Sequence, residues 1–225
     1  MIKLNSKLVI GGGFIGMIIL AFILFKLRPH TLTGCELAHN LTAHTRQVVV
    51  VQSATGSEAV INACQYDGKH WKPVLNSPYQ GTIGRNGIAS LATKIEGDDK
   101  SPAGLYALTE VFGTQPMTVK MDFKYITSAD KFIDDSSSKD YNTWVTGHTD
   151  AKRFEAMLHP AYKIGAVINY NTNPVIPGKG SAIFFHIWNS VAKPTAGCVA
   201  MDEKNLLAIL HWLDKNQNPH IYITR

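Results

Sequence analysis

Hydrophobic positions divide this chain into one long apolar run near its start and a series of short segments after it. Residues 8–25 are all apolar or glycine. The later segments have strand length and combine apolar, β-branched and aromatic residues. These predicted strands are residues 47–53, 59–65, 70–72, 105–112, 164–170, 181–188 and 220–224. So many short strands with few helices predict a β-rich domain of the α+β class.

Helix signals are few outside the first run. Apolar residues between 206 and 213 recur at helical spacing, and Asp202 precedes them as an N-cap. An amphipathic helix is therefore expected from Met201 onward. Asp150 is expected to cap a second, short helix that ends at Leu158.

A membrane anchor is predicted over residues 1–30. A helix of twenty residues spans about 30 Å, the thickness of a bilayer core. The charge-free run 8–25 has that scale, and it is long for the apolar part of a cleaved signal peptide. We therefore expect it to remain as an uncleaved helix. Residues 31–46 are polar and predict a linker to a folded domain over 47–225.

Two features near this predicted anchor leave its orientation and its processing open. Basic residues flank the run on both sides, so charge alone does not set its orientation in the membrane. A run similar to a lipobox ends at Cys35, but charged and polar residues separate it from the apolar run. Lipoprotein processing at Cys35 is therefore the less favoured alternative.

Composition permits one sizeable core and gives no support to a nucleic-acid partner. The chain has 225 residues, of which 45% are hydrophobic, and a formal net charge of +5. Four of the 22 basic residues precede residue 30, where no acid occurs. The rest of the chain carries 18 basic and 17 acidic residues, so no strongly basic face is expected in the folded part.

The candidate chemistry lies between residues 186 and 198. His186 falls near the end of the predicted strand 181–188, and Cys198 follows in a turn before the predicted helix. Backbone N–H groups and the helix dipole are expected to favour the thiolate, and an imidazole can take the thiol proton. These groups suffice for covalent acyl transfer, and Gly197 lets a substrate approach the backbone closely. The alternative is a buried structural cysteine and a hydrogen-bonded structural histidine.

Other motifs carry less weight. Ser136 with Lys139, and Ser190 with Lys193, both fit the S-x-x-K pattern of serine acyltransferases. Neither is accompanied by K-T-G or S-D-N, and the first lies in an acidic, serine-rich stretch that predicts a loop. Nine histidines occur, but the spacings H-E-x-x-H and C-x-x-C do not. We therefore predict neither a catalytic metal nor another cofactor.

The run Thr195-Ala196-Gly197-Cys198-Val199, with a histidine on the preceding strand, resembles the active-site signature of the L,D-transpeptidase catalytic domain (YkuD-type) family. Many members carry histidine two positions before the cysteine and arginine two positions after it, whereas this chain has Ala196 and Ala200. The resemblance spans about residues 47–225. It also rests on residues 84–87, 96–104, 134–135, 141–142, 170–171 and 180–184.

This resemblance implies a sandwich-like β-rich fold and cysteine-dependent acyl transfer on peptidoglycan stem peptides. By analogy, Cys198 attacks the carbonyl of the third stem residue and His186 acts as its base. Backbone N–H groups of Gly197 and Cys198, with Ala196, are expected to hold the oxyanion. The residues expected near the substrate are Thr195, Ser181, Tyr141, Asn142, Tyr170 and Asn171.

The outcome of the reaction stays open at this point. An amine acceptor would give a crosslink, and water would give the product of an L,D-carboxypeptidase. An alternative function is that of a non-catalytic, membrane-anchored wall-binding module. This alternative is considered because alanine stands at positions 196 and 200, where many family members carry histidine and arginine.

With the anchor predicted from the apolar run, we expect a single-pass membrane protein whose catalytic domain is extracytoplasmic (periplasmic). An oxidising compartment permits disulfides. If Cys198 is the nucleophile, Cys35 and Cys64 remain either as a bridged pair or as two separate thiols, and both interpretations stand.

Overall fold

The computed structural model describes residues 32–41, 44–190 and 193–225. The chain divides at residue 32, and the fold is that of Thr33–Arg225. The anchor predicted over residues 1–30 lies outside the described residues. Within the described ranges, no helix is both long and apolar enough to cross a membrane.

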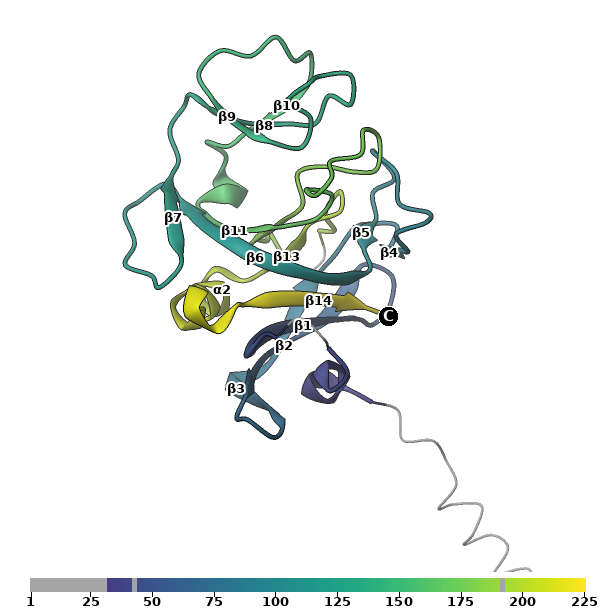
Figure 1. Cartoon of the computed structure of the whole chain (residues 1–225), viewed down its shortest axis with the longest axis vertical. Helices are drawn as coiled ribbons and strands as arrows, with labels where there is room; N and C mark the ends of the chain where they lie inside the picture. The colour runs from purple at the N-terminus through teal and green to yellow at the C-terminus, as the bar shows by residue number, and fades with distance from the viewer. Residues whose placement is uncertain (1–31, 42–43, 191–192) are drawn as a thin grey trace, which may run out of the picture. The chain divides into compact units, whose positions relative to one another are not determined.

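The main sheet closes on itself as a barrel (Figure 1). Its nine strands run in the order β11-β12-β13-β3-β2-β1-β14-β6-β7, and a further pairing joins β11 to β6. Eight strands therefore form the ring, and β7 adds to β6 outside it. The strands are β1 (Gln47–Ser53), β2 (Glu58–Tyr66), β3 (Trp71–Thr82), β6 (Gly104–Gly113), β7 (Asp122–Tyr125), β11 (Ile164–Ile168), β12 (Phe184–Ile187), β13 (Val199–Met201) and β14 (His220–Thr224). The predicted β-rich class is confirmed, and the sandwich-like arrangement takes the form of a closed sheet.

The core of the domain fills the interior of this barrel. Val49 and Val51 of β1 point into it and are fully buried. Val48 and Val50, on the opposite face of the same strand, are also fully buried, because they pack beneath the 3-10 helix η1 (Gly34–Ala38). Since both faces of β1 are covered, its valines form a continuous apolar run instead of alternating with polar residues.

The helix α2 (Glu203–Trp212) adds its apolar face to the barrel core. The Asp202 side chain caps it by accepting a hydrogen bond from Asn205 N at 2.9 Å, as the sequence predicted. A short 3-10 helix, η3 (Lys215–Gln217), then leads into β14. Three helix residues are fully buried against the barrel strands: Leu206, Ile209 and Leu210.

A second, three-stranded sheet has the order β10-β8-β9 (Figure 1). Its strands are β8 (Asp130–Ile133), β9 (Trp144–Thr146) and β10 (Phe154–Ala156). The short helix predicted between Asp150 and Leu158 is therefore wrong. The Asp150 side chain is almost fully exposed and contacts His148, whereas Phe154 pairs with Ile133 of β8. Pairing with a strand about twenty residues away overrode the local cap signal.

The stretch predicted as a linker contains η1, which is tied to the barrel by a disulfide between Cys35 and Cys64 of β2. Of the two interpretations of these cysteines, the bridged pair is the one the structure shows. Cys64 is fully buried, and Cys35 is 7% exposed. Residues 34–38 thus form part of the folded unit, because they cover the outer face of β1 and β2.

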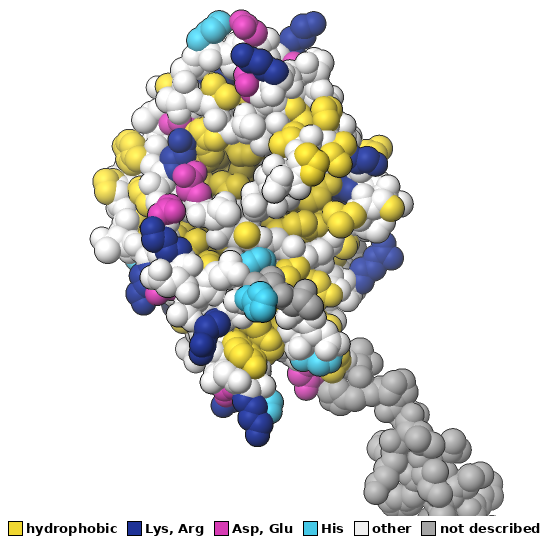
Figure 2. Space-filling view, viewed as in Figure 1, with side chains coloured by type: hydrophobic (Ala, Val, Ile, Leu, Met, Phe, Trp, Pro, Cys, Tyr) yellow, Lys and Arg dark blue, Asp and Glu magenta, His cyan; other side chains and the backbone are white. Residues whose placement is uncertain are grey.

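Charge on the surface of the domain is mixed. On the face shown in Figure 2, Lys and Arg side chains are scattered and alternate with Asp and Glu. Several pairs are in contact at the surface, among them Lys163 with Glu203 and Lys215 with Asp122. Exposed pairs of this kind contribute little to stability, because water and salt screen them.

Candidate active site

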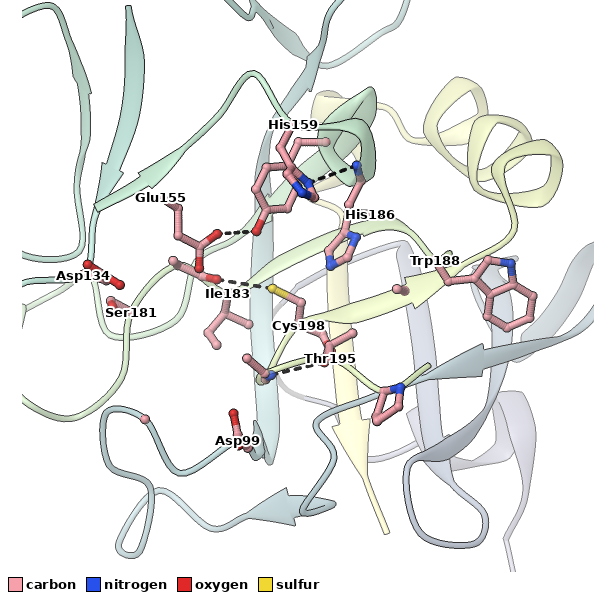
Figure 3. Close-up of a pocket in the computed structure, with 18 of the residues that line it drawn as sticks. Asp99, Asp134, Glu155, His159, Ser181, Ile183, His186, Trp188, Thr195 and Cys198 are labelled. Carbon is pink, nitrogen blue, oxygen red and sulfur yellow. Dashed lines mark hydrogen bonds between the residues drawn. The ribbon is translucent and has the colours of Figure 1, made fainter. Parts of the chain in front are cut away.

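The register of two neighbouring strands places Cys198 and His186 on one face of the barrel wall. β12 and β13 run parallel, with His186 opposite Ala200. Side chains two residues apart along a strand share a face, so Cys198, two positions before Ala200, lies on the same side as His186. Both line one cleft of about 530 Å³, and Figure 3 shows them in it together.

This face is the outer surface of the barrel. Cys198 packs with Phe184, Phe132 and Met157, and the last two come from the three-stranded sheet and its neighbouring loop. The alternate residues of the same strands, such as Val199, face the barrel core with α2. The cleft is therefore built where the second sheet meets β12 and β13.

The Cys198 thiol is buried and held by backbone groups. Its Sγ accepts a hydrogen bond from Phe184 N and donates one to Ala182 O, each at 3.3 Å. The residue is 8% exposed. Burial raises the pKa of the Cys198 thiol above its ordinary value, and the nearby Glu155 carboxylate raises that pKa further. The resting cysteine is therefore a neutral thiol.

The sequence-based expectation that a helix dipole favours the thiolate is wrong. The strand β13 lies between Cys198 and the start of α2 at Glu203. Each strand residue advances about 3.3 Å, so the helix begins well beyond the first-turn range over which its dipole acts.

His186 is fixed in one tautomer by its own strand. Its Nδ1 lies 2.8 Å from Ile187 O. A carbonyl oxygen can only accept, so Nδ1 carries the proton and donates it, and Nε2 is left as the basic nitrogen. Burial lowers the pKa of His186 to about 4, although the bond to Ile187 opposes this effect. The imidazole is thus neutral at pH 7 and able to accept a proton.

The loop that carries Cys198 is anchored by two hydroxyl groups. Thr195 Oγ1 donates to Cys198 O at 2.6 Å and accepts from Gly197 N at 3.1 Å. Ser101 Oγ, which is fully buried in the short strand β5 (Ser101–Pro102), donates to Gly197 O at 2.6 Å. β5 pairs with β4 (Ile88–Ala89) beside the cleft. These bonds fix the backbone on both sides of the sulfur.

Gly197 is required by this loop geometry. Its φ is +147°, and a Cβ there would lie 3.1 Å from Lys100 O and 3.2 Å from the Ile183 side chain. Its N–H is already donated to Thr195, so an oxyanion role for Gly197 needs that bond to open. The oxyanion roles of Gly197 and Ala196 stay predictions.

The residues predicted to contact substrate separate into two groups. Ser181 and Thr195 line the cleft with Ala196 and Gly197. The other four are not among the residues that line the cleft, and they are hydrogen-bonded within the protein. They hold the segment between residues 170 and 182: Tyr141, Asn142, Tyr170 and Asn171.

Asn142 shows how this second group supports the site. Its side chain donates to Tyr170 O and Asn171 O and accepts from Ala182 N at 3.1 Å. Ala182 has a φ of +53°, which is unusual for a residue with a side chain, and its carbonyl oxygen accepts from Cys198. Asn142 therefore holds the turn against which the thiol rests.

Sequence reasoning missed three residues that line the cleft. Glu96 accepts hydrogen bonds from Tyr141 and Ser181, and it lies in a segment that the resemblance includes. Glu155 and Tyr162 lie beside Cys198 and His186, and the Tyr162 hydroxyl donates to Glu155. Only the tertiary pairing of β10 places Glu155 there, so no local signal indicates it.

Of the serines and lysines in the two competing motifs, Lys193 lines the cleft and the others do not. Ser136 and Ser190 are exposed, and neither lines the cleft that holds Cys198. In the part of the chain that the structure describes, no group of three His, Cys, Asp or Glu side chains could hold a metal ion. The residues that converge at the cleft are those of a cysteine–histidine pair.

Comparison with known families agrees with this geometry. Residues 54–221 match the family model described as YkuD, L,D-transpeptidase catalytic domain. The chain therefore belongs to the L,D-transpeptidase catalytic domain family, whose members are enzymes that modify peptidoglycan. No curated protein and no solved structure matched the chain.

Proposed function

We propose that this protein is an L,D-transpeptidase that uses Cys198 as nucleophile and His186 as general base on peptidoglycan stem peptides. The observation that carries the proposal is the shared cleft of the two side chains, with His186 Nε2 left basic by the bond from Nδ1 to Ile187 O. A neutral imidazole next to a neutral thiol is the resting state that general-base catalysis requires.

The reaction begins when Cys198 Sγ leaves its backbone partners. The proton of the thiol passes to His186 Nε2 as sulfur attacks the carbonyl carbon of the third stem residue. The bond from that carbon to the terminal D-amino acid then breaks. His186 returns the proton to the leaving amine, and a thioester on Cys198 remains.

The acceptor completes the cycle. The amine of a second stem attacks the thioester carbon, His186 Nε2 takes one proton from that amine, and the proton returns to sulfur as the bond between carbon and sulfur breaks. Water in place of the amine gives L,D-carboxypeptidase activity, which is the second outcome. The third is a wall-binding module without turnover.

One experiment separates these outcomes. The full-length chain in detergent is incubated with purified muropeptides that carry tetrapeptide stems, and the products are analysed by mass spectrometry. Dimers with the combined mass of two muropeptides less one terminal D-amino acid support transpeptidation. Loss of the terminal residue alone indicates a carboxypeptidase. Unchanged muropeptides that stay bound to the protein contradict both activities.

The membrane anchor and the extracytoplasmic location are part of the same proposal. The disulfide supports an oxidising compartment, and a Cys35 sulfur bonded to Cys64 is not available for a lipid thioether. We therefore favour the anchor over lipoprotein processing. The protein should stay with membranes after a high-salt wash. A mature N-terminus at Cys35 with attached lipid would replace this interpretation.

A further inference from the structure

Tyr162 is the aromatic side chain that packs on the candidate base. It lies in the 3-10 helix η2 (Pro160–Tyr162), and its ring meets the His186 ring at a centroid distance of 5.3 Å and an angle of 89°. The same ring packs edge-on against Phe184 at 5.3 Å and Phe112 at 6.2 Å. These contacts pack against the Tyr162 ring, but none of them hydrogen-bonds its hydroxyl group.

The partner of this hydroxyl group is Glu155. The Tyr162 hydroxyl donates a hydrogen bond to the Glu155 carboxylate, which is the dashed line that ends at Glu155 in Figure 3. Glu155 lies on β10, where it pairs with Phe132 of β8. The hydrogen bond therefore links the three-stranded sheet to a ring that lies against the catalytic wall of the barrel.

The His186 ring needs a second contact of this kind. Its one hydrogen bond in the described structure is that of Nδ1 to Ile187 O, which fixes one edge of the ring. A ring held at one nitrogen can still tilt about that bond, and a tilt moves Nε2. The perpendicular Tyr162 ring limits this tilt.

We propose that Glu155 is a positioning residue, which fixes the Tyr162 hydroxyl so that the Tyr162 ring holds the His186 imidazole ready for proton transfer. This inference rests on the proposed function, because it assigns a supporting role around the same base. Glu155 and Tyr162 touch neither bond that breaks. They act through His186, so their removal should lower kcat and leave KM nearly unchanged.

Substitutions at both ends of the hydrogen bond test this role. Glu155→Ala removes the acceptor, Tyr162→Phe removes the donor but keeps the ring, and Glu155→Gln keeps an acceptor oxygen without the charge. We expect kcat to fall about tenfold in Glu155→Ala and in Tyr162→Phe, which is the usual scale for one lost hydrogen bond. The double variant should be no slower than either single variant, because the two residues act as one unit. Glu155→Gln should keep most of the activity, because its amide oxygen can still accept the hydrogen bond from Tyr162.

Controls come from outside the cleft. Glu110→Ala removes a partly buried glutamate, whose pKa burial raises as it does that of Glu155. Tyr106→Phe removes a buried hydroxyl that donates to Ala103 O at 2.6 Å. Both should retain the unsubstituted kcat.

NMR of the His186 imidazole gives a readout that does not depend on turnover. The Nδ1–H signal should be shifted or broadened in Glu155→Ala and Tyr162→Phe but kept in Glu155→Gln.

If the unsubstituted chain turns over no muropeptide, the proposed function fails while this signal still decides the positioning role. If kcat falls as far in Glu155→Gln as in Glu155→Ala, the proposal is overturned, because the charge of Glu155 and not its hydrogen bond would then be essential. Additive losses in the double variant, or an unchanged His186 signal in both single variants, would overturn it as well.

Discussion

Two outer faces of the same barrel carry the three cysteines, and they use them differently. On β1 and β2, Cys64 is bonded to Cys35, and η1 covers the face with small apolar side chains. Beside β12 and β13, Cys198 is not disulfide-bonded and lies among aromatic rings in a cleft. The first face is closed by packing, whereas the second is lined by polar groups.

The contrast concerns the surroundings of each cysteine, on which the proposed role of Cys198 depends. Burial alone does not distinguish the faces, because all three residues are less than a tenth exposed. What differs is the neighbourhood. Cys198 shares its cleft with His186 and with a loop that hydroxyl groups hold rigid, and η1 offers nothing comparable. Substitutions on the two faces should therefore separate activity from stability.

The largest effect is expected at the nucleophile. Cys198→Ala should abolish turnover of muropeptides and covalent labelling by a carbapenem, because the attacking atom is gone. Its fold should survive with stability lowered by about 1–3 kcal/mol, because Phe184 N loses Sγ as its hydrogen-bond acceptor. Ser190→Ala is the matched control and should stay active. Turnover that survives in Cys198→Ala but is lost in Ser190→Ala would move the chemistry to serine.

His186→Ala should reduce kcat about 10²- to 10⁴-fold, the usual contribution of a general base.

His186→Ala should also change how the free energy of unfolding depends on pH. The pKa of His186 is about 4 in the folded chain against an ordinary value of 6.5, so protons bind preferentially to the unfolded chain between these values. The folded chain should lose up to about 3 kcal/mol as pH falls from 6.5 through 4. Urea unfolding at pH 7, 5 and 4 should show that His186→Ala lacks this loss. An equal loss in the variant would contradict the assignment.

The disulfide face should give the opposite result. Cys35 and Cys64 are 29 positions apart, and opening a loop of that length costs about 3–4 kcal/mol of stability in the chain-entropy model. Cys35→Ala with Cys64→Ala should lower the unfolding midpoint and leave kcat of the folded protein unchanged. A large drop in kcat at a temperature where this variant is folded would show that the two faces are coupled.

The smallest effect is expected at the loop. Gly197→Ala places a methyl group 3.1 Å from Lys100 O at a φ that favours glycine, so it should cost about 1–3 kcal/mol of stability. Because Gly197 precedes Cys198, kcat should fall as well. Gly68→Ala is a control with a positive φ of +102° but nothing within 4 Å of the added carbon. It should lose stability without losing activity.

Features that depend on near neighbours along the chain could be predicted from the sequence. The valines of β1 predicted a strand with the bounds 47–53, and Asp202 predicted the cap of α2. The residues around Cys198 indicated the family that the match over 54–221 confirms. Each of these signals is local, because strand propensity, helix capping and a tight glycine turn act within a few residues.

Long-range contacts were needed to establish the closure of the barrel, the strand β10 and the protonation state of the thiol. The pairing of β11 with β6 and of β10 with β8 joins residues far apart in sequence, and no local pattern records it. The pKa of Cys198 rises because folded segments exclude water around it and bring Glu155 near. Desolvation depends on everything that covers a group, so the short sequence around Cys198 predicted a thiolate where the fold holds a neutral thiol.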